Sequence, residues 1–144
     1  MRRMIELVLS AIIVVVGVGS ATRAQESKQL RPVISPLVKS TKTAIGQPLA
    51  FPQSSVEITA VLVTLPAGSP PGRVHKHPHQ RIAYVLEGTL SVEQEGGETR
   101  HYPAGSMLIE MRDQWHRAGG VGNTSVRLLV IDIGPEGEQN TVWK

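Results

Sequence analysis

The 144-residue sequence predicts one all-β domain, a barrel or a sandwich, preceded by an export signal. Short runs rich in Val, Leu and Ile alternate with polar residues, as strands with one buried face do. Turns rich in Gly and Pro separate these runs at regular spacing. No amphipathic helical run of convincing length interrupts them. The predicted strands cover residues 56–65, 81–88, 89–94, 98–102, 106–111 and 125–133.

The first 24 residues contain the parts of a secretory signal peptide. A basic start, MRRMIE, precedes an apolar run from Leu7 to Val18, and small residues follow. This run is shorter than the roughly 20 residues that a membrane span needs. Cleavage after Ala24 or Ala21 would release a periplasmic or secreted protein without a stable membrane span. The alternative is an uncleaved N-terminal anchor.

The remainder divides into three predicted parts. Residues 25–55 are polar and contain four prolines, which rule out a long helix. We expect them to form a loose arm in which residues near Thr43 and Leu49 can make an edge strand. Residues 56–134 hold the predicted barrel strands, and residues 135–144 are expected to form a C-terminal tail. Residues 117–125 are predicted to be a loop because glycines cluster there.

Composition narrows the classes of function. Residues 1–24 contain three of the 15 Lys and Arg residues and one of the 12 Asp and Glu residues, which leaves 12 basic and 11 acidic residues. No strongly basic face therefore remains to attract nucleic acid, and we expect no nucleic-acid partner. The chain has no cysteine, which excludes disulfides and thiolate metal ligands.

All five histidines lie between residues 75 and 116. Residues i and i+2 of a strand point to the same face, so His75 and His77 can present two imidazoles side by side. His116 could face this pair across a barrel. Three neutral imidazoles with an open coordination position bind divalent metals such as Zn, Mn, Fe, Ni or Cu. The alternative is a metal-free pocket. His79 is expected in a loop and His101 on the surface of a strand.

Two stretches resemble the sequence motifs of the cupin superfamily, in its small single-domain form. AGSPPGRVHKHPHQRIAYVLEG is similar to the first motif, in which a glycine, an H-x-H pair, a glutamate and a second glycine follow in order; His75, His77 and Gly88 match. YPAGSMLIEMRDQWHRAGGVGN resembles the second motif, and Gly105 and His116 match. The resemblance covers residues 56–133 and implies a single jelly-roll β-barrel with the three histidines as a metal site.

The chain departs from the first motif at one position. Counting back from Gly88, Arg81 occupies the glutamate position. An arginine cannot bind a metal because it stays protonated and has no lone pair to give. The fourth ligand is therefore missing or replaced: Gln80 and His79 lie nearby, and Glu110 ends an apolar strand and is a candidate unless it faces outward. Arg81 could instead hold an anionic substrate by a forked hydrogen bond.

Two aromatic residues complete the predicted site. Tyr84 and Trp115 are expected in the core or in the pocket wall, where they could contact a substrate. Trp115, next to His116, could form an apolar lid.

Two classes of function remain open. The resemblance implies a metal-dependent enzyme, an oxygenase, decarboxylase or isomerase, that acts on a small organic molecule. The alternative is a non-catalytic module that binds a small molecule or a metal, which the lost glutamate favours slightly. A dimer with a vestigial pocket is a weaker possibility. By analogy with single cupin domains, we expect a homodimer.

Overall fold

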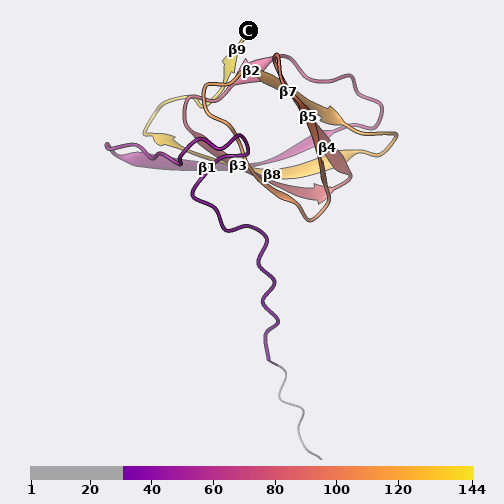
Figure 1. Ribbon diagram of the computed structural model, residues 1–144, viewed down its shortest axis with the longest axis horizontal. Coiled ribbons are helices and arrows are strands. Elements are labelled where there is room, and N and C mark those ends of the chain that lie inside the picture. The colour runs from indigo at the N-terminus through magenta and orange to yellow at the C-terminus, as the bar shows by residue number, and fades with distance from the viewer. Residues whose placement is uncertain (1–30) are drawn as a thin grey trace, which may run out of the picture. The chain divides into compact units, whose positions relative to one another are not determined.

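The computed structural model describes residues 31–144 (Figure 1). The predicted signal peptide, residues 1–24, and the start of the predicted arm lie outside the described residues. Residues Ile34–Lys144 form one compact unit. In the described part of the chain no segment is helical, so none meets the length and apolarity that a membrane-spanning helix requires.

Residues 31–144 form nine strands in two antiparallel sheets that face each other (Figure 1). One sheet has the order β1-β8-β3-β6 and the other has the order β5-β4-β7-β2-β9. The arrangement is a jelly-roll barrel, as the sequence predicted. The strands are β1 (Val56–Leu65), β2 (His75–Lys76), β3 (Gln80–Glu87), β4 (Thr89–Gln94), β5 (Thr99–Pro103), β6 (Met107–Ile109), β7 (His116–Gly120), β8 (Val126–Pro135) and β9 (Val142–Trp143).

The hydrophobic core lies between the inner faces of the two sheets. The register places Val130 of β8 beside Ala83 of β3, and Ala83 beside Leu108 of β6, so that these side chains share the inner face. The four-stranded sheet is apolar on its outer face too, which explains why its strands read as almost continuous hydrophobic runs. The buried core residues are Ala83, Val85, Leu90, Val92, Leu108, Met111, Val126, Leu128 and Val130.

The prediction of a loop over residues 117–125 is wrong at its start, where β7 forms. Hydrogen-bonded pairing with β4 from Gln94↔His116 to Leu90↔Gly120 holds this segment extended. Its glycines have a packing role that turn statistics do not reveal: a Cβ on Gly119 would lie 3.2 Å from the backbone of Pro71. Close approach of two segments, rather than a turn, therefore accounts for this glycine.

The described part of the arm is docked on the barrel. Thr43 and Gln47 close a tight turn, and an isolated bridge pairs Lys42 with Pro48. The amide side chain of Gln47 donates to the carbonyl of Arg112 and accepts from the amide of Arg112, each at 2.9 Å. The arm thus fixes the backbone beside Glu110. At the other end of the chain, the predicted tail contributes β9, which pairs with β2.

Gly88, between β3 and β4, provides a test of the fold. Its φ is +74°, and a Cβ would lie 2.4 Å from the carbonyl oxygen of Ser125. We expect Gly88→Ala to lower the free energy of unfolding by about 2–4 kcal/mol, from left-handed strain and overlap together. Gly96→Ala is the matched control: its φ is +69° with nothing within 4 Å of the added Cβ, so it should cost about 1 kcal/mol. Equal losses in urea unfolding would contradict this packing.

Candidate metal centre

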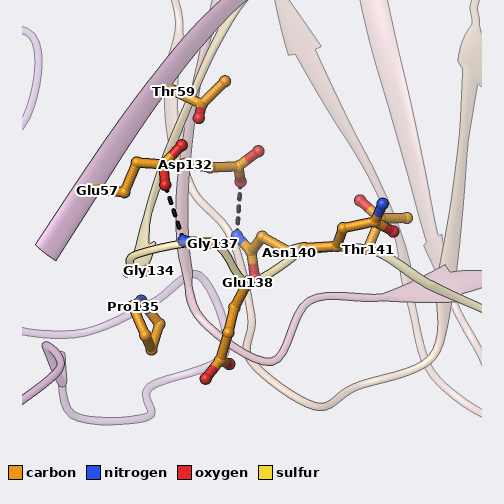
Figure 2. Close-up of a pocket in the computed structure, with 10 residues that line it drawn as sticks. Glu57, Thr59, Asp132, Gly134, Pro135, Gly137, Glu138, Asn140 and Thr141 are labelled. Atoms are coloured by element: carbon orange, nitrogen blue, oxygen red, sulfur yellow. Dashed lines mark hydrogen bonds between the residues drawn. The ribbon is translucent and has the colours of Figure 1, made fainter. Parts of the chain in front are cut away.

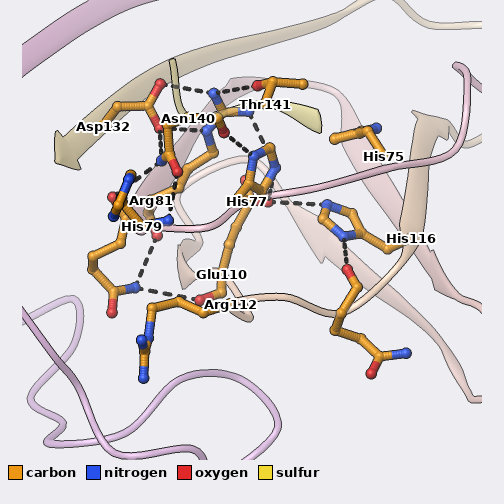
Figure 3. Close-up of polar contacts among 12 residues, drawn as sticks. His75, His77, His79, Arg81, Glu110, Arg112, His116, Asp132, Asn140 and Thr141 are labelled. Carbon is orange, nitrogen blue, oxygen red and sulfur yellow. Dashed lines mark hydrogen bonds and ion pairs between the residues drawn. The ribbon is translucent and has the colours of Figure 1, made fainter. Parts of the chain in front are cut away.

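The barrel brings the three predicted histidines together (Figure 3). His75 in β2 pairs directly with His116 at the start of β7, and directly paired residues of an antiparallel ladder point to the same face. His77 follows β2 by one residue. The ring centroids of His75 and His116 lie 4.5 Å apart, and those of His77 and His116 lie 5.0 Å apart. His77 and His116 are fully buried, and His75 is partly buried.

A backbone carbonyl fixes the tautomer of each ring. The Nδ1 atoms of the three histidines each lie within hydrogen-bond distance of a carbonyl oxygen: His75 of Arg73 at 2.8 Å, His116 of Gln114 at 2.8 Å and His77 of Asn140 at 2.6 Å. A carbonyl can only accept, so each Nδ1 donates. In the neutral ring this leaves the lone pair on Nε2. Metal-binding histidines are held by the same kind of bond.

One nitrogen from each of the three rings converges on a common point. The candidate ligand atoms all lie within 4.8 Å of one another. The Nε2 of His116 is buried and has no hydrogen-bond partner, and an unpaired buried polar atom calls for an explanation. Burial lowers the pKa of His75 to about 4, so this ring is neutral at neutral pH and its lone pair is free to bind a cation.

Glu110 adds a carboxylate to this cluster. Its side chain is almost completely buried just after β6, and its Oε2 lies 3.2 Å from Nε2 of His77 and 3.3 Å from Nε2 of His116. Burial opposes ionisation of Glu110, and hydrogen bonds from His116 and His77 outweigh burial and hold its pKa below the ordinary value where these rings carry a proton on Nε2. Where Nδ1 holds the only proton of each ring, the carboxylate faces nitrogen lone pairs at short distance, and a cation between them would relieve the repulsion.

These residues fit a divalent metal. Three imidazoles with fixed tautomers and one carboxylate form a donor set typical of Zn, Mn, Fe, Ni and Cu sites. The three histidines can hold the ion, and the unpartnered Nε2 of His116 is the clearest sign that an occupant is expected.

Arg81 lies beside the three histidines, but unlike the glutamate that it replaces it cannot bind a metal. Its Nε and NH2 groups donate to the two oxygens of Asp132, each at 2.7 Å, so Asp132 occupies the fork that could have held a substrate anion. A forked contact from these two groups to a substrate would require the displacement of Asp132. The NH1 group is directed at the cluster and donates to Nε2 of His77 at 3.2 Å.

The C-terminal segment contacts Asp132 of this ion pair through Asn140 (Figure 2). The side-chain amide of Asn140 donates to Asp132 at 2.6 Å, while the Asn140 carbonyl accepts from His77. Asp132 also lines a hollow of about 420 Å³ bounded by Glu57, Thr59 and the loop before β9. None of the three histidines lines that hollow, so the Arg81–Asp132 pair stands between it and the metal cluster.

The metal cluster opens into a smaller cavity of about 220 Å³ inside the barrel. Arg73, His75, Arg81, Glu110, His116 and Trp143 form its polar and aromatic part. Its apolar walls are Val63, Leu65, Leu90, Val92, Ala118, Leu128 and Val130, and Gly72 completes the lining.

The two aromatic residues predicted in the pocket wall do not line this cavity. Tyr84 alternates with the inward-facing Ala83 and Val85, so it points to the outer face of its sheet. Trp115 stacks beneath the ammonium groups of Lys76 and Lys144. Trp143 lies in the place expected of them, with its ring centroid 5.2 Å from that of His75.

One residue of the site that was not predicted has a recognisable signal in the sequence. Asp132 interrupts the apolar run at 125–133, and a buried charge needs a partner. Asn140 and Trp143 reach the site through long-range pairing that no local pattern reveals. The remaining histidines lie outside the cluster: the side chain of His79 contacts Glu138 at 2.9 Å, and His101 is exposed on β5.

Comparison with solved structures finds barrels of the same fold. A cupin-like protein from Thermotoga maritima aligns over 60% of this chain and 64% of its own, with a TM-score of 0.54 and 17% identity. A conserved Klebsiella pneumoniae protein with a double-stranded β-helix domain aligns over 65% and 84%, with a TM-score of 0.51 and 25% identity. The DMSP lyase DddQ from Ruegeria pomeroyi aligns over 69% and 47%, with a TM-score of 0.52 and 25% identity. This chain thus spans less than two thirds of the first and third proteins.

Comparison with curated protein sequences finds no match. The family model described as "Cupin domain" matches residues 61–132, which is half of the chain and includes all three clustered histidines, Arg81 and Glu110. Together with the jelly-roll barrel and its similarity to solved cupin structures, this match shows that the chain belongs to the cupin family.

Proposed function

We propose that this cupin is an exported protein that binds one divalent metal ion through His75, His77, His116 and Glu110. With the bound ion, the protein acts on a small organic molecule that enters the barrel cavity. The observation that carries the proposal is the convergence of three fixed imidazoles on one point, with the buried Nε2 of His116 unpartnered. Glu110 would supply, from the end of β6, the carboxylate that Arg81 replaces in the first motif.

The chain's own residues would do three things in such a reaction. The three carbonyl partners keep the imidazoles oriented, the apolar walls exclude water, and Arg81 keeps one N–H group directed at the cluster. A bound divalent ion with an open position supplies Lewis acidity, which polarises a carbonyl or carboxylate oxygen. A decarboxylase or isomerase would use this Lewis acidity, whereas an oxygenase would use the ion to activate dioxygen.

A non-catalytic binding module is the second candidate. One contact favours it: the NH1 group of Arg81 occupies the same Nε2 of His77 that a metal would use. If the protein is such a module, the guanidinium of Arg81 and the carboxylate of Glu110 satisfy part of the hydrogen-bonding capacity of the histidines. The cavity then holds a ligand without changing it. Turnover by metal-loaded protein, for example oxygen uptake with phenols, diketones and organic acids, distinguishes the two classes.

The metal site is tested by removing two of its ligands. We expect protein purified from a metal-supplemented culture to contain about one divalent ion per chain, and His77→Ala with His116→Ala to contain almost none. Each substitution removes a nitrogen ligand and its fixed geometry. His101→Ala is the control because this histidine is exposed on β5. Elemental analysis that finds equal metal in all three proteins would contradict the site.

The fourth ligand has its own test. Glu110→Gln keeps the volume and removes the charge, so we expect the metal dissociation constant to rise about tenfold or more. Glu98→Gln is the control because Glu98 is exposed. Competition with a chelator of known affinity measures the constant. An unchanged constant in Glu110→Gln would leave a three-histidine site and remove Glu110 from the ligand set.

We further propose that two copies pair through the outer face of the four-stranded sheet. The register aligns Leu62 of β1 with Leu129 of β8 and with Tyr84 of β3 on this face. Ile58 is 66% exposed and Leu62 is 65% exposed, which is unusual for a long edge strand. Because the same face exists on every copy, a twofold axis lets one patch cover another.

Replacing the exposed apolar side chain of Leu62 by a charge tests the pairing. We expect light scattering after size exclusion to give a dimer for the unchanged protein and a monomer for Leu62→Glu, since a dimer would bury the new carboxylate without a partner. Thr64→Glu, further along the same strand, should disturb the dimer less. A monomeric unchanged protein at micromolar concentration would show that this face is not a dimer interface.

A further inference from the structure

We propose that the barrel cavity takes a small carboxylate with an apolar body, and that Arg81 is the residue that selects its carboxylate. This inference rests on the proposed metal site and names the ligand class for that site. It follows from the hydrogen-bond pattern of one guanidinium, from the charges that line the cavity and from the nature of the cavity walls.

Among the nitrogens of the Arg81 guanidinium, NH1 has the one hydrogen bond that metal binding would break. Asp132 accepts from Nε and NH2, and the hydroxyl oxygen of Thr141 lies 3.2 Å from NH2. NH1 has only Nε2 of His77, also at 3.2 Å. That nitrogen has one lone pair. If the lone pair binds a metal, NH1 loses this acceptor and becomes an unpaired charged donor beside the cluster, which costs free energy in a largely buried site.

A negatively charged oxygen of a ligand can replace the hydrogen-bond acceptor that NH1 loses. A carboxylate offers two oxygens, so one can approach the metal's open position while the other accepts from NH1. A neutral amide or alcohol of the same shape could meet one of these needs but would gain less from the charged donor. Asp132 and Asn140 hold the guanidinium in position, so the donor is already oriented before a ligand enters.

The charges around the cavity also favour an anion. Arg73, Arg81 and Glu110 are the charged side chains that line it, and Asp132 neutralises Arg81. Glu110 offsets one charge of a divalent ion, and the other charge of the ion remains. Arg73 is exposed and donates through Nε and NH2 to the carbonyl oxygen of Lys144, so it adds little to the charge inside the cavity. Excess positive charge in a cavity with a low dielectric constant attracts a ligand of opposite sign.

The apolar walls of the cavity limit the size and polarity of the rest of the ligand. Beyond the charged end the cavity is bounded by Val, Leu and Ala side chains and by Trp143 near its mouth. Its volume of about 220 Å³ equals about seven waters at roughly 30 Å³ each. This space admits a short branched or unbranched aliphatic acid and excludes a molecule of drug size.

The test compares two probes that differ only in the head group. Calorimetric titration of metal-loaded protein with 3-methylbutanoate and with 3-methylbutanamide should show the acid binding at least tenfold more tightly. The double variant Arg81→Gln with Asp132→Asn removes the guanidinium without leaving an unpaired aspartate. It should retain the metal and lose about tenfold or more in affinity for the acid. The matched control, Arg117→Gln with Glu93→Gln, removes a bidentate ion pair on the surface and should bind as the unchanged protein does.

Equal affinity for acid and amide would overturn the inference, and this comparison needs no variant. Acid binding that persists at full strength in metal-loaded Arg81→Gln/Asp132→Asn would overturn the role of Arg81. Failure of the unchanged protein to retain a divalent metal is a different result, because it contradicts the proposed metal site itself.

Discussion

Three hydrogen bonds from imidazole Nδ1 atoms to backbone carbonyls set the chemistry of the barrel's interior. Two of the acceptors, Arg73 and Gln114, lie two residues before the histidine that they orient, so the chain just before β2 and just before β7 supplies them locally. The third acceptor is Asn140, which comes from the C-terminal segment. Because the carbonyls take the Nδ1 protons, each neutral ring keeps its lone pair on Nε2, and one ligand atom from each ring lies within 4.8 Å of the others. Arg81 donates to the lone pair of His77, and a cation would satisfy the lone pairs of His75 and His116 beside the carboxylate.

The charged residues around the three histidines differ from those of the cupin motif that the sequence resembles. Arginine stands at the glutamate position, and a glutamate stands at the end of β6 instead. Arg81 is tolerated inside the barrel because Asp132 binds its fork, and Asp132 is itself held by Asn140. This arrangement links the C-terminal segment to the metal site through two contacts, one with His77 and one with Asp132. It also leaves a single N–H group directed at the cluster, which is the basis for assigning a carboxylate ligand.

Local patterns in the sequence predicted the strands that alternate or that are continuously apolar, such as β1, β4 and β8. Histidine spacing in a strand, with a resemblance to two motifs, predicted which imidazoles meet. What local patterns could not reveal is long-range pairing. The segment of β7 resembles a glycine-rich loop, although Gly119 allows a close approach to Pro71 instead of a turn. Trp143 and Asn140 lie near the end of the chain and reach the site only through the pairing of β9 with β2. The sequence predicts Tyr84 in the core or in the pocket wall, although strand alternation beside Ala83 turns it outward.

An anomalous diffraction map from crystals of the metal-loaded protein, recorded on both sides of the metal's absorption edge, tests the proposed metal site most directly. If the site is correct, the map shows one strong peak at bonding distance from Nε2 of His75, His77 and His116 and from one oxygen of Glu110, and Arg81 is no longer bonded to His77. A peak elsewhere in the molecule, or a His77–Arg81 contact that persists at saturating metal, would contradict it.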